Sequence, residues 1–445
     1  MSERAVIELN DTSVIVHDGS GIIHESPGYI VDTGKQTWLG KEAQKRAYLY
    51  SNQCENKFWS EIACAENNDV RQADVTLAMR HLTSIWQHVS DQINAAVLVV
   101  PGSFTKTGLG ILLGLCKELS IPVRAMVHKA VLCPHQLDHV GDTAHVDIQL
   151  HHTVITPLHT LNDDHVVGDV KVLYGMGIIK LHTQVAEFIA REFINKTRLD
   201  PMHSAELEQQ LYDHLPRWLQ DSQHNDVVVC NFEYQDKAFE LMVNSTELNN
   251  IYNEYIYDIV NAVRSVSTEQ NIITCLTDTI DAQIGFSRGA YKHGLKVRVL
   301  DAAYFARQSF AYNEEILTAD DQVYLIKQLP FTLLSDPLGS PVVNKQNYVK
   351  PDYVLFCHHA YLIKDMIMLV KNAQDHYELQ HGLADADDVA LTIRDNQTEV
   401  YIEPDQQCAI EVNGQLIQSY CKLSVGDCIK VPGCEYVLTL IKVDN

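Results

Sequence analysis

Hydrophobic and polar positions divide the first part of the chain into short strands and one clear helix. Residues 5–9 and 13–19 are rich in β-branched side chains and are separated by turn formers, which predicts a hairpin. Residues 95–100 form a continuous apolar run, typical of a strand buried on both faces. Leucines at helical spacing follow, and residues 121–127 read as the next strand. This β-α-β order predicts an α/β core, and residues 39–50 predict a further helix.

The same rhythm begins again from residue 145. A strand-rich block ends near residue 174, and the helix predicted for residues 179–194 places Leu181, Val185 and Phe188 on one side. Residues 227–243 then read as a hairpin and residues 245–266 as a helix. Two late core strands are expected at residues 271–276 and 296–300.

The character of the chain changes after Ala311. From there on, short alternating strands are interrupted by Pro, Gly and Asn-Gly, which favours an all-β region. We place the boundary near Asp320, so that an α/β domain of residues 1–320 precedes a β-rich domain of residues 321–445.

Composition mainly excludes functions. The formal net charge is -24, and no cluster of Lys and Arg forms a stripe for a phosphate backbone, so nucleic acid is not expected as a partner. No leader pattern or bilayer-spanning apolar run occurs, so we expect a cytoplasmic protein without membrane contact. The 11 cysteines form no Cys-x-x-Cys pair, which favours reduced core thiols.

Three strings carry a resemblance to a known family. They are "DGSGIIHESPGYIVDTGKQTWLGKEAQKR" at 18–46, "VLVVPGSFTKTGLGILLGLCKELSIPVRAMV" at 97–127 and "GDVKVLYGMGIIKLHTQVAEFIAREF" at 168–193. In this order they resemble the nucleotide-binding domain of DnaK-type heat-shock chaperones, in the actin-like ATPase superfamily, over about residues 4–312. The resemblance implies a two-lobed fold built from a duplicated mixed sheet with helices, and an ATP site between the lobes.

The nucleotide motifs of that family are degenerate here. Where the family has Asp-Leu-Gly-Thr-Thr, this chain reads "ELNDT" at 8–12, so the metal-facing aspartate becomes Glu8 and the glycine becomes Asn10. The second phosphate loop reads "DIQLHH" at 147–152, which keeps Asp147 and lacks the glycines. Backbone amides are not expected to close on an anion with β-carbons in the way. The family's Asn-Glu-Pro-Thr becomes "VHKA" at 127–130, which removes its glutamate.

The resemblance still identifies candidate positions. Lys57 and Asp147 are the catalytic candidates, with a surface lysine as the alternative for Lys57. The degenerate cleft is assigned to Glu8, Asn10, Asp11, Thr12, Gln149, His151, Gly175, Gly177, Leu276 and Thr277. We expect no cofactor. His135 and His139 have helical spacing for a metal, but the surrounding Pro and Gly favour polar surface histidines between Cys133 and His152, so no metal site is expected.

The C-terminal region allows two interpretations. Asn413-Gly414 and Gly426-Asp427 resemble the last turns of the forkhead-associated β-sandwich, although Asn413-Gly414 is also what an ordinary hairpin requires. That family's Gly-Arg and Ser-x-x-His elements are not recognisable, so phosphopeptide binding is doubtful. Alternatively, residues 323–339 are similar to the linker and first strand of a chaperone's substrate sandwich, without a helical lid.

Two hypotheses about function follow. Losing glycine loops and acidic ligands together removes most of what phosphoryl transfer requires, which favours a chaperone-like or scaffolding protein that binds a protein partner. The alternative is a divergent ATPase that slowly hydrolyses Mg-ATP. In that case Asp147, Glu8 or Asp11 holds magnesium through water and Lys57 lies near the γ-phosphate.

Overall fold

The computed structural model divides the chain into two compact units, Met1–Thr332 and Leu333–Asn445. In the first unit it describes residues 4–66, 69–133, 143–161, 164–235, 237–267, 272–317 and 322–330. In the second unit it describes residues 350–356, 359–364, 366–371, 377–381, 389–395, 400–404, 410–412, 415–417, 421–431 and 437–442. Mixed α/β structure therefore precedes an antiparallel β region, as the sequence predicts.

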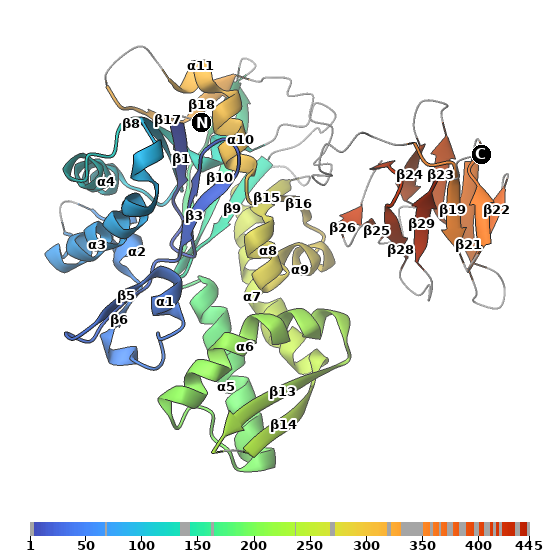
Figure 1. Ribbon diagram of the computed structural model, residues 1–445, viewed down its shortest axis with the longest axis horizontal. Coiled ribbons are helices and arrows are strands. Elements are labelled where there is room, and N and C mark those ends of the chain that lie inside the picture. Colours follow the sequence, from blue (N-terminus) through green and yellow to red (C-terminus); the bar gives the residue numbers. More distant parts are fainter. Residues whose placement is uncertain are drawn as a thin grey trace. The chain divides into compact units, whose positions relative to one another are not determined.

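A first mixed sheet has the strand order β17-β8-β7-β1-β2-β3 (Figure 1). The strands are β1 (Arg4–Glu8), β2 (Val14–His17), β3 (Ile22–Ser26), β7 (Ala95–Val100), β8 (Val123–His128) and β17 (Leu325–Ile326). Strands β1, β2 and β3 form an antiparallel meander, and β7 and β8 continue in parallel from β1. The predicted hairpin and the buried strand at residues 95–100 are both confirmed.

A second sheet repeats this arrangement. Its strands are β9 (Thr143–Ile148), β10 (His152–Leu161), β11 (Asp164–Val167), β12 (Lys171–Tyr174), β15 (Ile273–Thr277), β16 (Lys296–Leu300) and β18 (Gln328–Pro330). Again an antiparallel meander, β9-β10 with β11 and β12, continues in parallel through β15 and β16. The order and directions of β8-β7-β1-β2-β3 thus match those of β16-β15-β9-β10-β11.

The helices of the first half connect β3 to β7 and β7 to β8. They are α2 (Phe58–Ala63), α3 (Gln72–Val89) and α4 (Lys106–Glu118). A small sheet of β4 (Ile30–Asp32), β5 (Thr37–Leu39) and β6 (Cys54–Glu55) carries α1 (Gly40–Gln44). The helix expected over residues 39–50 is therefore limited to five residues. Turns and a short 3-10 segment follow it, and most of the backbone hydrogen bonds there span three residues instead of four.

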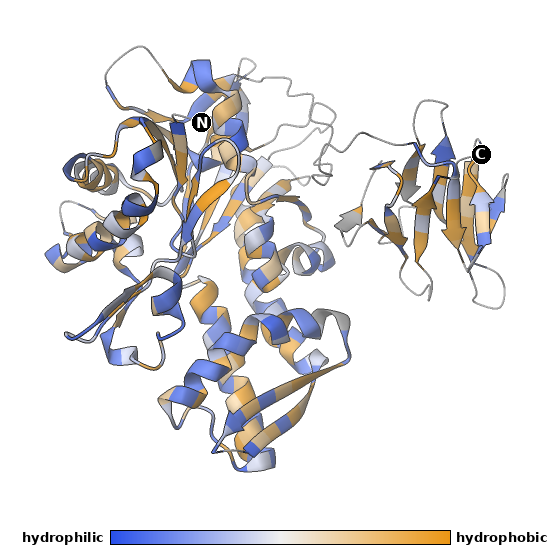
Figure 2. Ribbon diagram, in the orientation of Figure 1, coloured by the Kyte–Doolittle hydropathy of each residue, from blue (hydrophilic) through white to orange (hydrophobic). Residues whose placement is uncertain are grey.

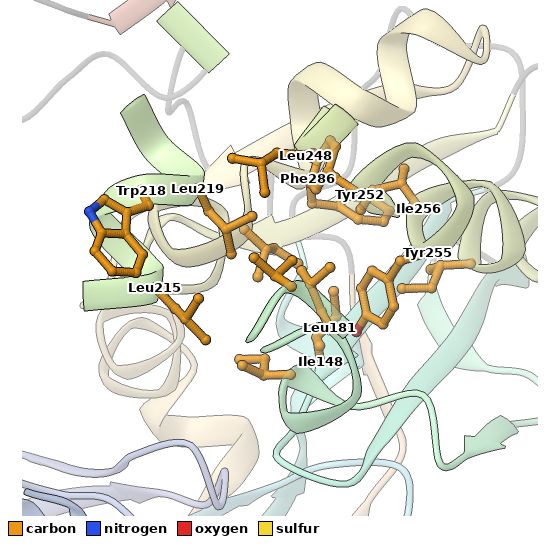
Figure 3. Close-up of a cluster of buried hydrophobic side chains, with 14 of the residues drawn as sticks. Ile148, Leu181, Leu215, Trp218, Leu219, Leu248, Tyr252, Tyr255, Ile256 and Phe286 are labelled. Carbon is orange, nitrogen blue, oxygen red and sulfur yellow. The ribbon is translucent and has the colours of Figure 1, made fainter. Parts of the chain in front are cut away.

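The helices of the second half surround one hydrophobic cluster (Figure 3). They are α5 (Ile178–Thr197), α6 (Ala205–His224), α7 (Ser245–Ser265), α8 (Asp278–Ile284) and α9 (Phe286–Lys292). Leu181, Trp218 and Ile256 come from α5, α6 and α7, and Figure 3 draws them around the same core. The predicted hairpin is confirmed as β13 (Val227–Tyr234) and β14 (Lys237–Asn244), at the far end of these helices in Figure 1.

The two sheets share a core along their facing sides. Val6, Val97 and Val127 of the first sheet form one cluster with Leu158 and Cys275 of the second. Two helices, α10 (Tyr304–Ala311) and α11 (Asn313–Ile316), add Phe305 and Ile316 to it. Hydrophobic residues accordingly follow the central strands in Figure 2. Polar residues at the ends of these strands therefore lie next to a hydrophobic core that the two sheets share.

Residues 325–330 join both sheets. Strand β17 pairs in parallel with β8 of the first sheet, and β18 pairs antiparallel with β11 of the second. The boundary expected near Asp320 places this stretch in the β-rich domain. By its pairing it belongs to the first unit, which ends at Thr332, because its backbone hydrogen bonds are made with the two central sheets.

The second unit consists of two antiparallel sheets with the orders β20-β19-β29-β28-β25-β26 and β22-β21-β23-β24-β27. The strands are β19 (Tyr353–Phe356), β20 (His359–Leu362), β21 (Met366–Lys371), β22 (Tyr377–His381), β23 (Val389–Asp395), β24 (Val400–Pro404), β25 (Ile410–Val412), β26 (Gln415–Ile417), β27 (Cys421–Leu423), β28 (Cys428–Lys430) and β29 (Leu438–Ile441). Val354, Leu369, Leu391 and Leu440 from both sheets form one core, so the region is sandwich-like. Asn413-Gly414 lies outside the described residues.

Candidate functional site

A buried lysine lies between two carboxylates that come from the two sheets. Glu8 ends β1, Asp147 lies in β9, and Lys129 follows directly after β8. The Lys129 Nζ is 2.9 Å from Glu8 Oε1 and 2.8 Å from Asp147 Oδ1. The same ammonium lies 5.0 Å from the centre of the Phe305 ring. Lys129 is only 1% exposed, so this charge is compensated almost entirely by protein groups.

Two amide side chains complete the coordination of Asp147. Asn10 Nδ2 donates to Asp147 Oδ1 over 3.1 Å, and Gln149 Nε2 donates to Asp147 Oδ2 over 3.0 Å. Both oxygens of this carboxylate are thus engaged by protein donors. We call Lys129, Glu8, Asp147, Asn10 and Gln149 the Lys129 cluster. It joins the first sheet to the second through polar contacts alone.

The charges in this cluster influence one another. Burial opposes the charge of Lys129, but Asp147 and Glu8 outweigh it and raise the pKa of the ammonium. Burial also opposes the charge of Asp147, yet the Lys129 ammonium beside it lowers the pKa of this carboxyl. For Glu8, burial prevails over Lys129 and the pKa is raised. The stable arrangement is therefore an ion pair of Lys129 with Asp147, and Glu8 is the acid that protonates more readily.

The turn after β1 binds the turn after β9. Asp11 Oδ1 accepts a hydrogen bond of 2.7 Å from the backbone N–H of Leu150. One backbone amide of this second loop, at a residue that carries a β-carbon, thus binds a carboxyl oxygen of the same protein. Burial raises the pKa of Asp11 to about 7, against the stabilising bond from Leu150.

The side chain of Leu150 fills space beneath the small sheet. It is 4% exposed and packs with Tyr29, Val31, Ala43 and Ala47. Leucine at this position therefore adds an apolar contact between the two halves. Glycine would have left that space empty.

A second bridge between the halves lies nearby. The rings of Tyr48 and Tyr212 stack with their centres 3.6 Å apart. The backbone N–H of Tyr48 also donates to Gln209 Oε1 over 2.9 Å. Tyr212 and Gln209 belong to α6, so the turn that follows α1 in the first half contacts a helix of the second half through both the ring and the backbone of Tyr48.

Between the two loops there is a small cavity of about 10 Å³. Its lining residues are Leu9, Asn10, Asp11, Val14, Trp59, Ala63, Pro101, Phe104 and Gln149. A cavity of this size holds about one water molecule. Asp11 is one of the lining residues, and its Oδ2 is buried without a hydrogen-bond partner among the residues that the structure describes.

The other candidate residues are distributed around the cluster. Thr12 donates to Asn10 Oδ1 from both its backbone and its hydroxyl, so it orients that amide. Gly177 begins α5, and a Cβ there would lie 2.2 Å from the carbonyl oxygen of Leu150, so only glycine allows this approach. Gly175 is exposed in a turn with a φ of +71°. Leu276 is fully buried in the cluster of Figure 3, and Thr277 ends β15.

Lys57 is an exposed residue at the start of α2 and does not belong to the Lys129 cluster. Its charge contributes, after burial, to lowering the pKa of His151 to about 4. His151 Nε2 contacts the backbone oxygen and side chain of Asn56, the residue before Lys57. The two catalytic candidates are thus separated: Asp147 belongs to the Lys129 cluster, whereas Lys57 lies at the start of α2.

Histidines in this region are mostly interior residues. His145 is 2% exposed and His152 is 1% exposed, so the expectation of polar surface histidines is wrong for both. Burial lowers the pKa of His145 to about 3 and that of His152 to about 4, which keeps them neutral. His135 and His139 lie outside the described residues. Among the residues that the structure describes, no group of three His, Cys, Asp or Glu side chains is suited to a metal ion.

Sequence reasoning missed Lys129. It named the residue only as part of a lost family motif, although one signal was present. A lone cation stands inside the apolar stretch "AMVHKAVL", where an exposed lysine would be unusual. Its partners are 121 and 18 residues away in sequence, at Glu8 and Asp147, so their identity required the fold.

Comparison with known proteins gives no assignment: no protein-family model matches this chain, and no curated protein does either. Within the described parts of the chain, no helix combines the length and the apolar character that crossing a membrane requires.

Proposed function

We propose that the first unit is a two-lobed actin-like domain of the DnaK type whose nucleotide cleft is filled by its own side chains. The protein then acts as a chaperone-like or scaffolding protein that binds a protein partner and does not hydrolyse ATP. The repeated strand order of the two central sheets supports the two-lobed fold, since a duplicated mixed sheet is what the family resemblance implies.

The position of the Lys129 ammonium carries the proposal. The resemblance aligns Glu8 with the family's metal-facing aspartate and Asp147 with the aspartate of its second loop. In this chain an ammonium bridges the two carboxylates at 2.9 and 2.8 Å. A divalent cation needs carboxylate oxygens that are free to bind it, and here both oxygens of Asp147 and Oε1 of Glu8 are engaged by Lys129 and two amides. Among the described residues Glu8 Oε2 alone of these four oxygens has no partner, and the Lys129 ammonium already lies between the two carboxylates. The residues present therefore do not fit magnesium.

The phosphate side of the cleft supports the same conclusion. The backbone N–H of Leu150 donates to Asp11 Oδ1, so an oxygen of a side-chain carboxyl group occupies the place that the resemblance would give to a phosphate oxygen. Leu150 fills the adjacent space, and the cavity lined by Asp11 and Gln149, of about 10 Å³, has room for about one water molecule. Phosphoryl transfer depends on positioning phosphates and metal, and both positions are taken.

The second unit supports a role in protein binding. Its sandwich-like pair of antiparallel sheets is compatible with the forkhead-associated resemblance, and such sandwiches present loops at both ends for recognition. Phosphopeptide binding is not part of the proposal, because the residues that grip phosphothreonine in that family are not recognisable in the sequence.

The test is a calorimetric titration of the full chain with ATP and ADP, with and without magnesium, followed by a phosphate-release assay. The proposal predicts no binding heat and no hydrolysis above buffer for a sample shown to be folded by circular dichroism. Magnesium-dependent hydrolysis that Asp147→Ala abolishes would overturn it in favour of a divergent ATPase.

A further inference from the structure

The β13–β14 hairpin presents an apolar outer face. Its residues alternate between buried and exposed, and the inner ones belong to the core of Figure 3. On the outer face Val229 lies opposite Met242, and these side chains are 46% and 64% exposed. Val227, also 46% exposed, is the next outer residue along β13. Two strands alone thus carry a cluster of exposed apolar side chains.

The direction of the backbone groups follows from one contact of Glu233. The side chain of Gln210, from α6, accepts from the Glu233 N–H at 3.2 Å and donates to its carbonyl oxygen at 3.1 Å. The polar backbone groups of Glu233 therefore point away from β14. In an antiparallel pair such residues alternate and face each other, so Ala238, Glu240 and Met242 direct their N–H and C=O groups to the outer edge of β14.

The edge of β14 is open to a further strand. None of the hydrogen bonds among described residues involves the outward backbone groups of Ala238, Glu240 or Met242. On β13, by contrast, the amide of Gln210 makes the two bonds that an added peptide would make. On the β13 edge, the backbone N–H and C=O of Glu233 are thus paired with a side-chain amide. On the β14 edge, the backbone N–H and C=O groups of three residues are available to pair with an added strand.

Charge indicates which segment fits. Glu240 and Glu233 are exposed on the outer face beside the apolar cluster, and neither forms an ion pair with a described residue. A strand added to β14 places alternate side chains next to Ala238, Glu240 and Met242. We propose that this edge binds an extended segment of a partner protein by strand addition. That segment carries a basic residue beside Glu240 and an apolar residue, two positions along, beside Met242.

A second copy of the chain fits less well. Antiparallel pairing of two β14 strands about Glu240 would bring like charges opposite each other, which is destabilising. Each copy also carries a net charge of -24, which opposes self-association and attracts a basic segment. This inference rests on the proposed role in protein binding and names the surface and the kind of partner.

The experiment uses the full chain and a labelled peptide, acetyl-Ser-Thr-Lys-Thr-Val-Thr-Ser-amide, in a fluorescence anisotropy titration at low salt. Two peptides serve as controls: one with Glu in place of Lys, and one with alternate backbone nitrogens methylated. Methylation keeps the charge but removes the donors that strand pairing needs. We expect saturable binding of the first peptide and at least about fivefold weaker binding of both controls.

Two variants of the hairpin test the edge itself. Met242→Pro removes an outward N–H without removing a bond to β13, so it should weaken binding at least about fivefold while leaving the fold intact. Glu240→Lys should weaken it by a similar factor through charge. Glu314→Lys is the matched control, because this exposed residue of α11 gives the same change in net charge away from the hairpin.

The inference is overturned if the peptide does not bind, or if it binds the folded Met242→Pro variant and the wild type equally. It is also overturned if sedimentation shows a dimer that Met242→Pro abolishes, since the edge then serves a second copy. ATP hydrolysis would contradict the proposed function without altering peptide binding, so the two failures can be told apart.

Discussion

The Lys129 cluster and the β13–β14 hairpin differ in whether their polar groups are paired within the protein. In the cluster, Glu8, Asp147 and Lys129 compensate one another inside the protein, and the turns around them are closed by Asp11 and Leu150. In the hairpin, the outward backbone groups of Ala238, Glu240 and Met242 have no hydrogen-bond partner among the described residues. A resemblance to nucleotide-binding proteins would direct attention to the first region. Unsatisfied backbone groups and exposed apolar side chains direct it to the second.

The largest effect is expected from Lys129→Met. Removing the cation leaves Glu8 and Asp147 buried without their counter-charge, which should reduce the free energy of unfolding by about 4 kcal/mol. Urea unfolding followed by circular dichroism measures it. The triple variant with Glu8→Gln and Asp147→Asn removes all three charges and should recover much of the loss. If the triple variant is as unstable as the single one, lost packing explains the effect rather than lost compensation.

Leu150→Ala comes next. Its side chain is almost fully buried against Tyr29 and Val31, so truncation should cost about 3 kcal/mol. The variant should give no binding heat in the ATP titration, because Asp11 and Lys129 still occupy the cleft. Ile22→Ala, at an exposed position of β3, is the control and should change the free energy of unfolding only slightly. ATP binding by the Leu150 variant would mean that this leucine alone blocks the site.

Asp11 should make stability depend on pH. Its folded pKa of about 7 lies above the unfolded value near 3.8, so the folded state holds this proton more tightly. The resulting stabilisation is complete below the unfolded pKa and is lost as the pH rises toward the folded one. Between pH 5 and pH 6.5 the wild type should therefore lose about 2 kcal/mol relative to Asp11→Asn. Parallel urea curves at both pH values check this, and an unchanged difference would contradict it.

The smallest effects on stability are expected in the hairpin. Met242→Lys and Val229→Thr replace side chains that are 64% and 46% exposed, so the free energy of unfolding should change by less than about 0.5 kcal/mol. Thermal unfolding of each variant measures this. A large destabilisation would show that the outer face of the hairpin is structural, which would weaken the contrast with the cluster.

Regular patterns predicted much of the fold. The apolar run at residues 95–100, the hairpin at 227–243 and the helix at 245–266 are local features, because a period of 2 or 3.6 residues is visible within one segment. Strands β17 and β18 were assigned to the wrong region, because their partners β8 and β11 lie more than 150 residues away in sequence. Pairing over such distances leaves no periodic signal.

The candidate site was predicted in part. Glu8, Asn10, Asp11, Asp147 and Gln149 do lie together, and the resemblance was the reason for selecting them. Lys129 was missed because its function depends on two carboxylates from other segments. The sequence also did not show that Leu150 can bind Asp11 through its backbone N–H while its side chain is packed in a core. A β-carbon was treated as an obstacle to anion binding, and whether it is one depends on the space that neighbouring segments leave.

The segment that forms β17 and β18 has a mechanical consequence. It pairs with one sheet and, within a few residues, with the other, before the chain continues beyond Thr332. Tension applied to the chain at that point acts first on the short strand β18 and then on β17. Its three- and two-residue pairings would yield before the longer central strands. A force applied through the second unit would thus detach β18 and then β17 from the two sheets. This change in the first unit would precede its unfolding.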